Sequence, residues 1–585
     1  MKMGARFAFR LGTIGAVSVL ALTGCRLTRL PDSDVAFPAT WTHGPDDLPV
    51  RARSAMVSTA ADGATQVGLD VLRAGGNAVD AAVAAAFALA VVYPEAGNLG
   101  GGGFIVFRPS EGGTAFALDF RERAPGAAFR EMYLDSLGEL TGESVRGHRA
   151  SGVPGSVMGL WEAHQRFGSL PWVDLVEPAI ELAEGFEVSA DLAGSLGGAE
   201  RRLGAYESSR ATFFPEGAAP DSGEVFRQPD LARTLGRIRD QGGDGFYGGE
   251  TADLIVAEMA RGGGLVSLED LAAYEAVWRD PVTFRYRGYT LYSMSPPSSG
   301  GATLALMAHM LEGYDVASLG WHSARSIHLF AETWKRAFAD RNEALADPDY
   351  VEIPLERMVS PEHAVERSAD ISWDRATPSS SIGTGLRVAE GNETTHLSVV
   401  DAEGNAVALT TTLNSLYGSG VTVGGAGFLL NNEMDDFAAR PGFPNQFGLV
   451  QGQQNAIEPG KRMLSAMTPT VVEDPNGELF LVLGTPGGPT IITTVLQVLV
   501  NVIDFGMSIT QAVNAPRIHH QHLPDVIEYE SGGLTPAVAD SLRALGQTLD
   551  ERGGTSGNVQ AIMVLSDGTR VGHSDPRGDG ASAGY

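Results

Sequence analysis

The pattern of this 585-residue chain changes abruptly near residue 394. Residues 372–393 lose all hydrophobic periodicity and accumulate Ser, Thr and Gly. A segment of this kind is typically exposed and flexible, and proteolysis selects such segments. Directly after it, His396–Val400, a turn over 401–405 and Ala406–Thr412 predict a β-hairpin. We therefore expect an exposed junction immediately before a pair of strands.

Thr394 stands at that junction, followed by Thr395 and His396. A threonine hydroxyl is a weak nucleophile that needs a base. If the chain breaks before Thr394, the new α-amine can be that base, with a pKa of about 7.7–8.0. The hydroxyl attacking the Glu393 carbonyl is a route to that break. The spacing alone does not decide this, because two threonines at a strand start also fit simple β-propensity.

The N-terminal half contains strong signals for buried structure. Ala64–Tyr93 predicts two helices separated by Gly75-Gly76-Asn77, and the second, Ala78–Val92, is apolar nearly all round and hence buried. Four glycines, 100–103, precede a strand over Phe104–Phe107. No GK[ST] follows and the strand–loop–helix order is reversed, so we interpret the glycines as a close backbone approach or a tight turn.

Further elements alternate without βαβ regularity. Helices are predicted over Asp174–Glu184, Thr303–Leu311 and Thr490–Asp504, and strands over Thr283–Ser293 and Leu479–Leu483. The length alone allows roughly two to four domains. Strands between helical stretches, with no repeat of fixed period, instead favour stacked sheets covered by helices.

The first 25 residues have the pattern of a secretory signal. Basic residues precede an apolar stretch, Leu11–Leu22, that is too short to span a bilayer, and Leu22-Thr23-Gly24-Cys25 resembles a bacterial lipobox. We expect Cys25 to become a lipidated N-terminus and residues 26–50 to form a tether. The alternative is an ordinary signal peptide with a chance cysteine.

Composition excludes several classes of protein. The net charge of −29 disfavours nucleic-acid binding, and we interpret the acidity as solubility in an exposed compartment. The single cysteine rules out a disulfide framework. His519, His520 and His522 form an H-H-x-H cluster, but no second ligand cluster supports a metal site, so we assign them a structural role and expect no metal.

Several motifs occur in one order along the chain. They are Pro94-Glu95-Ala96-Gly97-Asn98-Leu99-Gly100-Gly101-Gly102, Leu118-Asp119-Phe120-Arg121-Glu122-Arg123-Ala124-Pro125, Thr394-Thr395-His396-Leu397-Ser398-Val399-Val400-Asp401, Thr410-Thr411-Thr412-Leu413-Asn414, Leu430-Asn431-Asn432-Glu433-Met434-Asp435-Asp436-Phe437, Thr485-Pro486-Gly487-Gly488, Asn514-Ala515-Pro516-Arg517, Ser574-Asp575-Pro576-Arg577 and Ala583-Gly584-Tyr585. Together they resemble the γ-glutamyltransferase (glutathione hydrolase) family over nearly all of residues 51–585.

The resemblance implies an α+β, four-layer αββα N-terminal-nucleophile fold, with two stacked, mainly antiparallel sheets between helices. It implies cleavage between Glu393 and Thr394 into a large subunit (51–393) and a small subunit (394–585) that stay together. Thr394 would hold a γ-glutamyl ester that is released to water or to an amino acid or peptide amine. No cofactor and no nucleic acid are implied. The protein would be lipid-anchored on the periplasmic side of a bacterial envelope, with membrane contact through the anchor alone.

The resemblance also assigns site residues by position. Gly487 and Gly488 match the oxyanion hole, where no Cβ blocks the approach of a backbone N–H. Thr412 matches the threonine that hydrogen-bonds the nucleophile. The substrate-binding positions are Arg121 and Ser465 for the α-carboxylate, and Asn414, Glu433 and Asp436 for the α-amino group.

Two positions depart from the family pattern. Two adjacent serines usually contact the α-carboxylate, but here Ala466 follows Ser465. Losing a hydrogen bond to a charged group costs about 1.5–3 kcal/mol, or tenfold or more in affinity. In the loop Pro441–Gly452, Phe447 stands where several bacterial members place a tyrosine. These departures keep one alternative open, an acylase with another acyl group such as a glutaryl β-lactam side chain. A second alternative, of a different class, is a non-catalytic, envelope-anchored binding protein that kept the fold.

Overall fold

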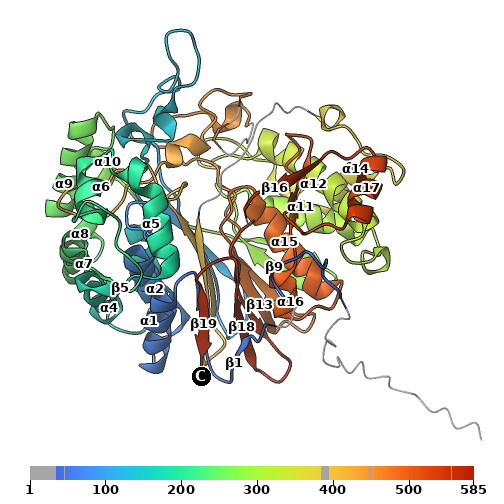
Figure 1. Cartoon of the computed structure of the whole chain (residues 1–585), viewed down its shortest axis with the longest axis horizontal. Helices are drawn as coiled ribbons and strands as arrows, with labels where there is room; N and C mark the ends of the chain where they lie inside the picture. Colours follow the sequence, from blue (N-terminus) through green and yellow to red (C-terminus); the bar gives the residue numbers. More distant parts are fainter. Residues whose placement is uncertain (1–34, 45–46, 384–393, 444, 447–450, 555) are drawn as a thin grey trace, which may run out of the picture.

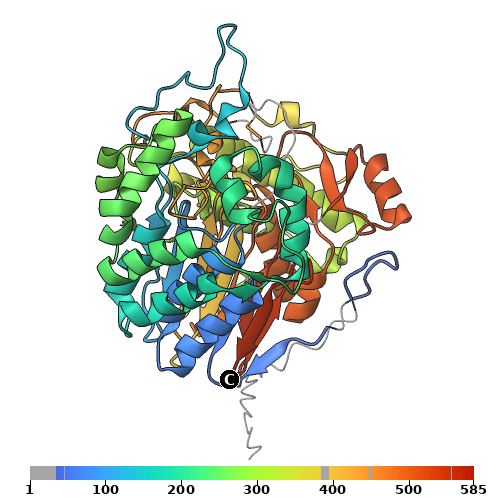
Figure 2. The same cartoon turned by 60° about the vertical axis from the view of Figure 1, so that its left-hand side comes forward.

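Two seven-stranded sheets lie face to face in the computed structural model, with helices on both outer faces (Figures 1 and 2). The structure describes residues 35–44, 47–383, 394–443, 445–446, 451–554 and 556–585. All strand pairs within the two large sheets are antiparallel. The predicted fold class is therefore confirmed.

The first large sheet carries the junction at residue 394. Its strands, in spatial order, are β19 (Ala581–Gly584), β2 (Met56–Thr59), β10 (Thr395–Val400), β11 (Ala406–Thr412), β3 (Gly102–Arg108), β4 (Phe116–Phe120) and β7 (Val277–Arg279). β10 and β11 are the predicted hairpin, at the centre of the sheet. Because this sheet contains strands from both before and after residue 394, neither part of the chain completes it alone.

The second large sheet mixes the two parts of the chain in the same way. Its strands are, in order, β1 (Val50–Ala52), β18 (Arg570–Ser574), β17 (Gln560–Val564), β13 (Leu479–Gly484), β12 (Thr470–Glu473), β9 (Tyr289–Ser293) and β8 (Val282–Tyr286). Smaller sheets join β14 (Ile518–His519), β15 (Ile527–Glu530) and β16 (Leu549–Arg552), and β5 (Phe186–Glu187) with β6 (Val225–Phe226). Side chains such as Met56, Val106, Val400, Val471 and Val482 fill the layer between the two large sheets.

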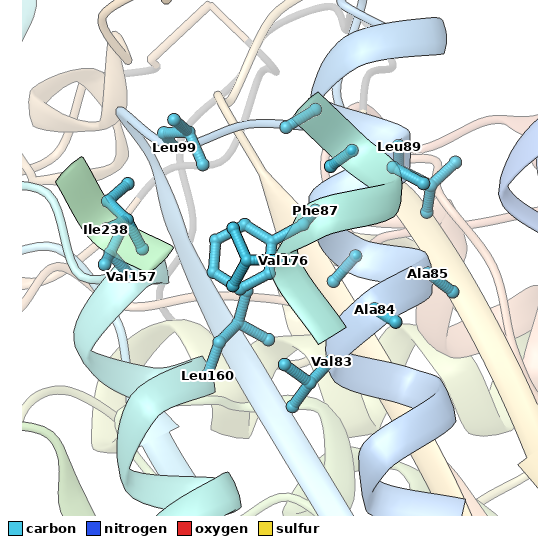
Figure 3. Packing of buried hydrophobic residues seen from close by; sticks show 14 of the residues in the cluster. Val83, Ala84, Ala85, Phe87, Leu89, Leu99, Val157, Leu160, Val176 and Ile238 are labelled. Atoms are coloured by element: carbon cyan, nitrogen blue, oxygen red, sulfur yellow. The ribbon is translucent and has the colours of Figure 1, made fainter. Parts of the chain in front are cut away.

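One helical layer covers the outer face of the first sheet. It contains α1 (Asp62–Arg73), α2 (Ala78–Val92), α3 (Ser156–Phe167), α4 (Trp172–Glu184) and α7 (Pro229–Gln241). Helix α2 is buried along its length except at Val92, as its sequence predicts. A capping box between Asn77 and Asp80 fixes its start. Figure 3 shows its apolar side chains, including Phe87, packed against residues from the neighbouring helices.

A second helical layer covers the other sheet. Its main helices are α11 (Gly300–Glu312), α12 (Ala324–Ala344), α15 (Thr490–Ile503) and α16 (Ile509–Asn514). The remaining helices are α5 (Ala190–Leu203), α6 (Glu207–Phe213), α8 (Asp244–Tyr247), α9 (Gly249–Gly262), α10 (Leu268–Ala272), α13 (Leu355–Met358), α14 (Pro361–Ser368) and α17 (Pro536–Ala544). Each large sheet is thus enclosed by helices on one face and by the other sheet on the opposite face.

The prediction of one strand over Thr283–Ser293 is wrong. The segment forms the two strands β8 and β9, joined by Arg287 and Gly288, which have φ of 52° and 87°. A two-residue turn with positive φ at both positions matches the twist of an antiparallel pair and reverses the chain. The polar–apolar alternation continues through the turn, so periodicity alone does not reveal the turn.

The glycines at 100–103 are a close approach of backbones, which was one of the two interpretations from sequence. A Cβ on Gly101 would lie 2.0 Å from the Thr412 carbonyl oxygen, and one on Gly103 would lie 2.3 Å from that of Thr410. β3 and the chain before it therefore lie directly against β11. The glycines bring the N-terminal part of the chain up to the strand that carries Thr412.

The expected signal and Cys25 lie outside the described residues. Part of the expected tether is described and contacts the body, where the Trp41 indole donates to the Asn514 carbonyl oxygen at 2.8 Å. Within the portion that the structure describes, we find no helix both long and apolar enough to cross a membrane.

Candidate active site

Thr394 immediately precedes β10 and is 6% exposed. Its hydroxyl donates to the Thr412 hydroxyl oxygen, with 3.4 Å between the two oxygens. Thr412 ends the neighbouring strand β11, and its hydroxyl also accepts from the Asn414 backbone N–H at 2.7 Å. Asn414 has φ of 78°, which turns the chain sharply after the strand. The central hairpin therefore places Thr394, Thr412 and Asn414 together.

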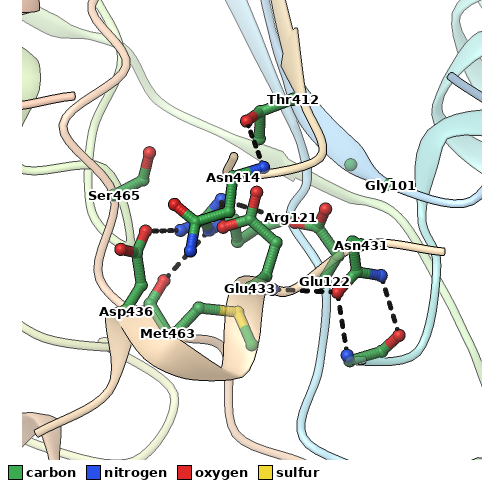
Figure 4. Close-up of polar contacts among 12 residues, drawn as sticks. Gly101, Arg121, Glu122, Thr412, Asn414, Asn431, Glu433, Asp436, Met463 and Ser465 are labelled. Carbon is green, nitrogen blue, oxygen red and sulfur yellow. Dashed lines mark hydrogen bonds and ion pairs between the residues drawn. The ribbon is translucent and has the colours of Figure 1, made fainter. Parts of the chain in front are cut away.

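Arg121 forms the charged centre of the site. One guanidinium nitrogen contacts Glu433 at 2.7 Å, and the other pairs with Asp436. Its Nε donates to the Met463 carbonyl oxygen at 3.2 Å. Figure 4 shows the guanidinium between the two carboxylates, with Asn414 and Thr412 beside them. Residues far apart in the sequence thus meet in one buried ion cluster.

Three carboxylates share this guanidinium, since Glu122 also contacts Arg121, at 3.4 Å. Burial raises the pKa of Glu122 to about 8, against the attraction of Arg121. Burial likewise raises the pKa of Glu433, and the neighbouring carboxylates add to this effect. Burial alone would lower the pKa of Arg121, but the carboxylates together raise it. The arginine therefore stays charged, while the surplus of buried carboxylates favours retention of a proton among them.

The Gly487-Gly488 pair stands between two cavities. Gly488 and Thr394 line a small cavity together with the ion cluster. Gly487 and Thr394 also line a much larger cavity of about 1340 Å³. Both glycines have positive φ, and a Cβ on Gly487 would lie 2.4 Å from the Thr490 hydroxyl oxygen. Only Pro489 separates the pair from helix α15, whose N-terminal end favours negative charge.

The structure brings the predicted site residues together. Lining the small cavity are Thr394, Thr412, Gly488, Arg121, Asn414, Glu433, Asp436 and Ser465, and Gly487 adjoins them on the side of the larger cavity. Ala466 also lines the small cavity, as does Arg341, a residue that sequence reasoning missed. The motif containing Arg121 also contains Glu122, which was given no role. Phe447 lies outside the described residues.

His396, the third residue of the Thr-Thr-His motif, hydrogen-bonds within the sheets. Its Nδ1 lies 2.8 Å from the Thr410 hydroxyl oxygen and its Nε2 lies 3.1 Å from that of Ser398. Gly484 of the opposite sheet leaves space for the ring, because a Cβ there would lie 2.4 Å from it. Burial lowers the pKa of His396 to about 3, so the imidazole is neutral at physiological pH.

The buried His396 predicts a pH dependence of stability. An unfolded histidine takes up a proton near pH 6.5, whereas folded His396 does so only near 3. Between these values the unfolded state binds more protons, so the free energy of unfolding falls as the pH falls, by up to ~1.4 kcal/mol per pH unit for this group. Urea unfolding of the His396→Gln variant between pH 4 and 7 should show a shallower pH slope than wild type. Identical slopes would contradict this assignment.

The histidines of the H-H-x-H cluster contact different partners. His519 Nδ1 lies 2.8 Å from the Thr493 hydroxyl oxygen, and His520 Nε2 lies 3.3 Å from Asp525. His522 is fully buried. Across the parts of the chain that the structure describes, no group of three His, Cys, Asp or Glu side chains has a geometry that could hold a metal ion.

Comparison with known proteins agrees with this geometry. Residues 64–585 match the protein-family profile described as Gamma-glutamyltranspeptidase. This chain belongs to the γ-glutamyltranspeptidase family. It is 48% identical over 543 residues to the glutathione hydrolase proenzyme of Escherichia coli K12, covering 92% of this chain and 93% of that protein. The resemblance seen in the motifs is therefore confirmed.

Solved structures of the γ-glutamyltranspeptidase family and of acylases share the fold. The cephalosporin acylase of Bacillus halodurans superposes with a TM-score of 0.82 at 29% identity, covering 94% of this chain and 99% of that chain. The γ-glutamyltranspeptidase of Helicobacter pylori has a TM-score of 0.55 at 42% identity, covering 56% of this chain and 94% of that chain. The family makes this protein an enzyme rather than a non-catalytic binding protein.

Proposed function

We propose that this protein is a self-processing hydrolase and transferase that cleaves the γ-glutamyl amide of glutathione and related compounds. The observation that carries the proposal is the convergence of Thr394, Gly488 and the Arg121 ion cluster on one small cavity, with Gly487 adjoining it on the side of the larger cavity. A nucleophile, a pair of backbone donors and groups of both charges are what an acyl transfer on a zwitterionic γ-glutamyl group requires.

Processing comes first in this mechanism. The Thr394 hydroxyl attacks the carbonyl carbon of Glu393, the peptide C–N bond breaks, and the Thr394 nitrogen takes up a proton as an ester forms. Water then hydrolyses that ester and regenerates the hydroxyl. The products are a large subunit, 51–393, and a small subunit, 394–585, whose first residue has a free α-amine. The interleaved strands of both large sheets keep the two subunits together after the cut.

Catalysis uses the same hydroxyl. The α-amine of Thr394 accepts its proton as the hydroxyl oxygen attacks the γ-glutamyl carbonyl carbon, and the N–H groups of Gly487 and Gly488 stabilise the negative oxygen. The amide C–N bond then breaks, and the proton passes to the leaving amine. Water or an acceptor amine attacks the resulting γ-glutamyl ester on Thr394, which frees the hydroxyl again. Thr412 holds the hydroxyl in position through their shared hydrogen bond.

Recognition of the γ-glutamyl group uses the ion cluster. The substrate's α-ammonium faces Glu433, Asp436 and the Asn414 side chain, and its α-carboxylate faces Arg121 and Ser465. The two charges of the zwitterion thereby add to the ion pairs that Arg121 makes with the two acids. Because the cluster is buried, these contacts form at a low dielectric constant, where each electrostatic interaction is stronger than in water.

The larger cavity receives the rest of the substrate and the acceptor. Carboxylates outnumber guanidinium groups in its lining by eight to two, counting Asp62, Glu95, Glu187, Asp191, Glu528, Asp550, Glu551 and Asp579 against Arg552 and Arg577. Such a lining attracts cationic amines and disfavours anionic groups beside the scissile bond.

An acylase acting on another acyl group is the second candidate, and Ala466 together with the likeness to cephalosporin acylase favours it. A γ-glutamyl anilide and its glutaryl analogue, which lacks the α-amine, separate the two. We expect kcat/KM to be roughly 10²-fold or more higher for the γ-glutamyl compound, because the glutaryl group has no α-ammonium to contact Glu433 and Asp436. Equal or faster turnover of the glutaryl compound would establish the acylase instead.

We also propose export and lipid anchoring in the bacterial envelope, on the periplasmic side. Residues 1–25 form the signal, Cys25 carries the lipid, and residues 26–50 form the tether. The sequence Leu22-Thr23-Gly24-Cys25 supports this assignment. Substitution of Cys25→Ala should move the protein from the detergent phase to the aqueous phase on partitioning, and unchanged partitioning would exclude the anchor.

A further inference from the structure

Arg341 is a fully buried guanidinium on α12 that has no counter-ion among the described residues. Its Nε donates to the Ser299 hydroxyl oxygen and one terminal nitrogen donates to the Asn342 side-chain oxygen, both at 2.8 Å. The other terminal nitrogen, Nη2, is buried and has no hydrogen-bond partner within the described residues. An unpaired buried charge is costly, so its presence calls for an explanation.

The neighbouring cations on the same helix show the contrast. Lys335 and Arg336 are also buried, and both pair with Glu332. Asp436 raises the pKa of Arg341 at a distance, but burial outweighs it and lowers the pKa to about 10. Arg341 therefore remains protonated at neutral pH, without the ion pair that its neighbours possess.

Arg341 lines the small cavity together with Ser465 and Ala466. Ser299 links them, since its hydroxyl accepts from Arg341 and donates to the Ser465 carbonyl oxygen. The Ser299 backbone N–H donates to the same carbonyl at 2.7 Å. These hydrogen bonds fix the Arg341 guanidinium relative to the Ser465-Ala466 segment, where Ala466 stands in place of a serine and supplies no hydroxyl donor.

Arg121 has little donor capacity left for a ligand. Of its five N–H groups, four face Glu433, Asp436, Glu122 and the Met463 carbonyl oxygen. One remaining N–H cannot hold a carboxylate with two hydrogen bonds. Arg341 lines the same cavity, and both N–H groups of its Nη2 lack a partner among the described residues.

We propose that Arg341 binds the α-carboxylate of the γ-glutamyl group directly, as a second guanidinium beside Arg121, and compensates for the hydroxyl that Ala466 lacks. This inference rests on the proposed function and adds a binding residue to it. The substrate carboxylate becomes the counter-ion of Arg341. A guanidinium–carboxylate contact of this kind carries opposite charges on both partners and can form two parallel hydrogen bonds, where a serine hydroxyl donates only one.

The test compares a γ-glutamyl anilide with its α-carboxamide analogue, whose α-carboxylate is replaced by a neutral amide. In Arg341→Met, kcat/KM for the γ-glutamyl anilide should fall roughly tenfold to hundredfold, mainly through KM. For the carboxamide analogue, kcat/KM should change by no more than about threefold, because this substrate has no α-carboxylate for Arg341 to bind. Adding Ala466→Ser to Arg341→Met should recover part of the loss on the γ-glutamyl anilide alone.

Arg336→Met is the matched control, because Arg336 is buried on the same helix but does not line the cavity. Any effect of that variant on turnover should be equal for the two substrates. If Arg341→Met also lowered both substrates by the same factor, Arg341 would have a structural role and the inference would be wrong. The Arg341→Lys variant keeps the buried positive charge, so it serves as a second variant if Arg341→Met fails to fold. A wild-type enzyme that turned over neither substrate would instead overturn the proposed function, and this inference with it.

Discussion

The Thr394→Ala variant should remain one uncut chain on a denaturing gel, where wild type gives two. In the proposed mechanism, the substitution removes the hydroxyl that attacks Glu393 and the same hydroxyl that later forms the γ-glutamyl ester. Both processing and turnover therefore depend on one oxygen. We expect kcat to fall at least about 10⁴-fold, as when the nucleophile of other covalent hydrolases is removed.

Thr395→Ala provides the control for that result. Thr395 is the next residue, is 1% exposed and lines neither cavity. Its variant should be processed into two chains and should retain activity. Thr394→Ser keeps a hydroxyl and should retain some processing. Two bands from Thr394→Ala would refute the assignment of the nucleophile.

The Arg121→Met variant should lose both stability and substrate binding. Without the guanidinium, Glu433 and Asp436 are left buried without their principal cation. Breaking a buried ion pair in this way costs about 3–5 kcal/mol, and proton uptake by the carboxylates sets where in that range the loss falls. We expect a lower denaturant midpoint, and a fall in kcat/KM for a γ-glutamyl anilide of roughly 10²-fold or more.

The Arg108→Met variant separates the loss of stability from the loss of substrate binding. Arg108 forms a buried ion pair with Glu473 at 2.9 Å, and it lines neither cavity. Its variant should lose stability to a similar degree but keep kcat/KM near the wild-type value once folded. If the two variants lost activity equally, the role of Arg121 would be structural and its assignment to the α-carboxylate would fail.

Local patterns predict the elements that bury apolar surface. Helix α2 forms over the predicted residues because a continuous apolar stretch has to be buried, and an Asn77 cap fixes where it starts. The hairpin of β10 and β11 follows from alternating strands around a polar turn. The order of strands within the two sheets does not follow in this way, because pairing of β19 with β2, or of β1 with β18, joins opposite ends of the chain.

The same distinction between local and tertiary features applies to the residues of the site. Thr394 is a candidate from local pattern, because it lies between an aperiodic segment and a strand. Its assignment as nucleophile, and that of Gly487 and Gly488 to the oxyanion hole, depend on the family resemblance. Arg341 is not predictable, because it lies within a helix, α12, whose sequence gives no sign of a cavity. The role inferred for Arg341 depends on its neighbours in the folded structure, because none of the described ones supplies a carboxylate as its counter-ion. His396 is given no role of its own from sequence, and the structure shows it buried among Thr410, Ser398 and Gly484.

Mass spectrometry of the purified protein, before and after brief exposure to a γ-glutamyl anilide, tests the central claim most directly. We predict a small subunit that begins at Thr394 and that gains the mass of one γ-glutamyl group on that threonine during turnover. The added mass should disappear once the substrate is exhausted. An N-terminus elsewhere, or turnover with the added group on another residue, would contradict the account.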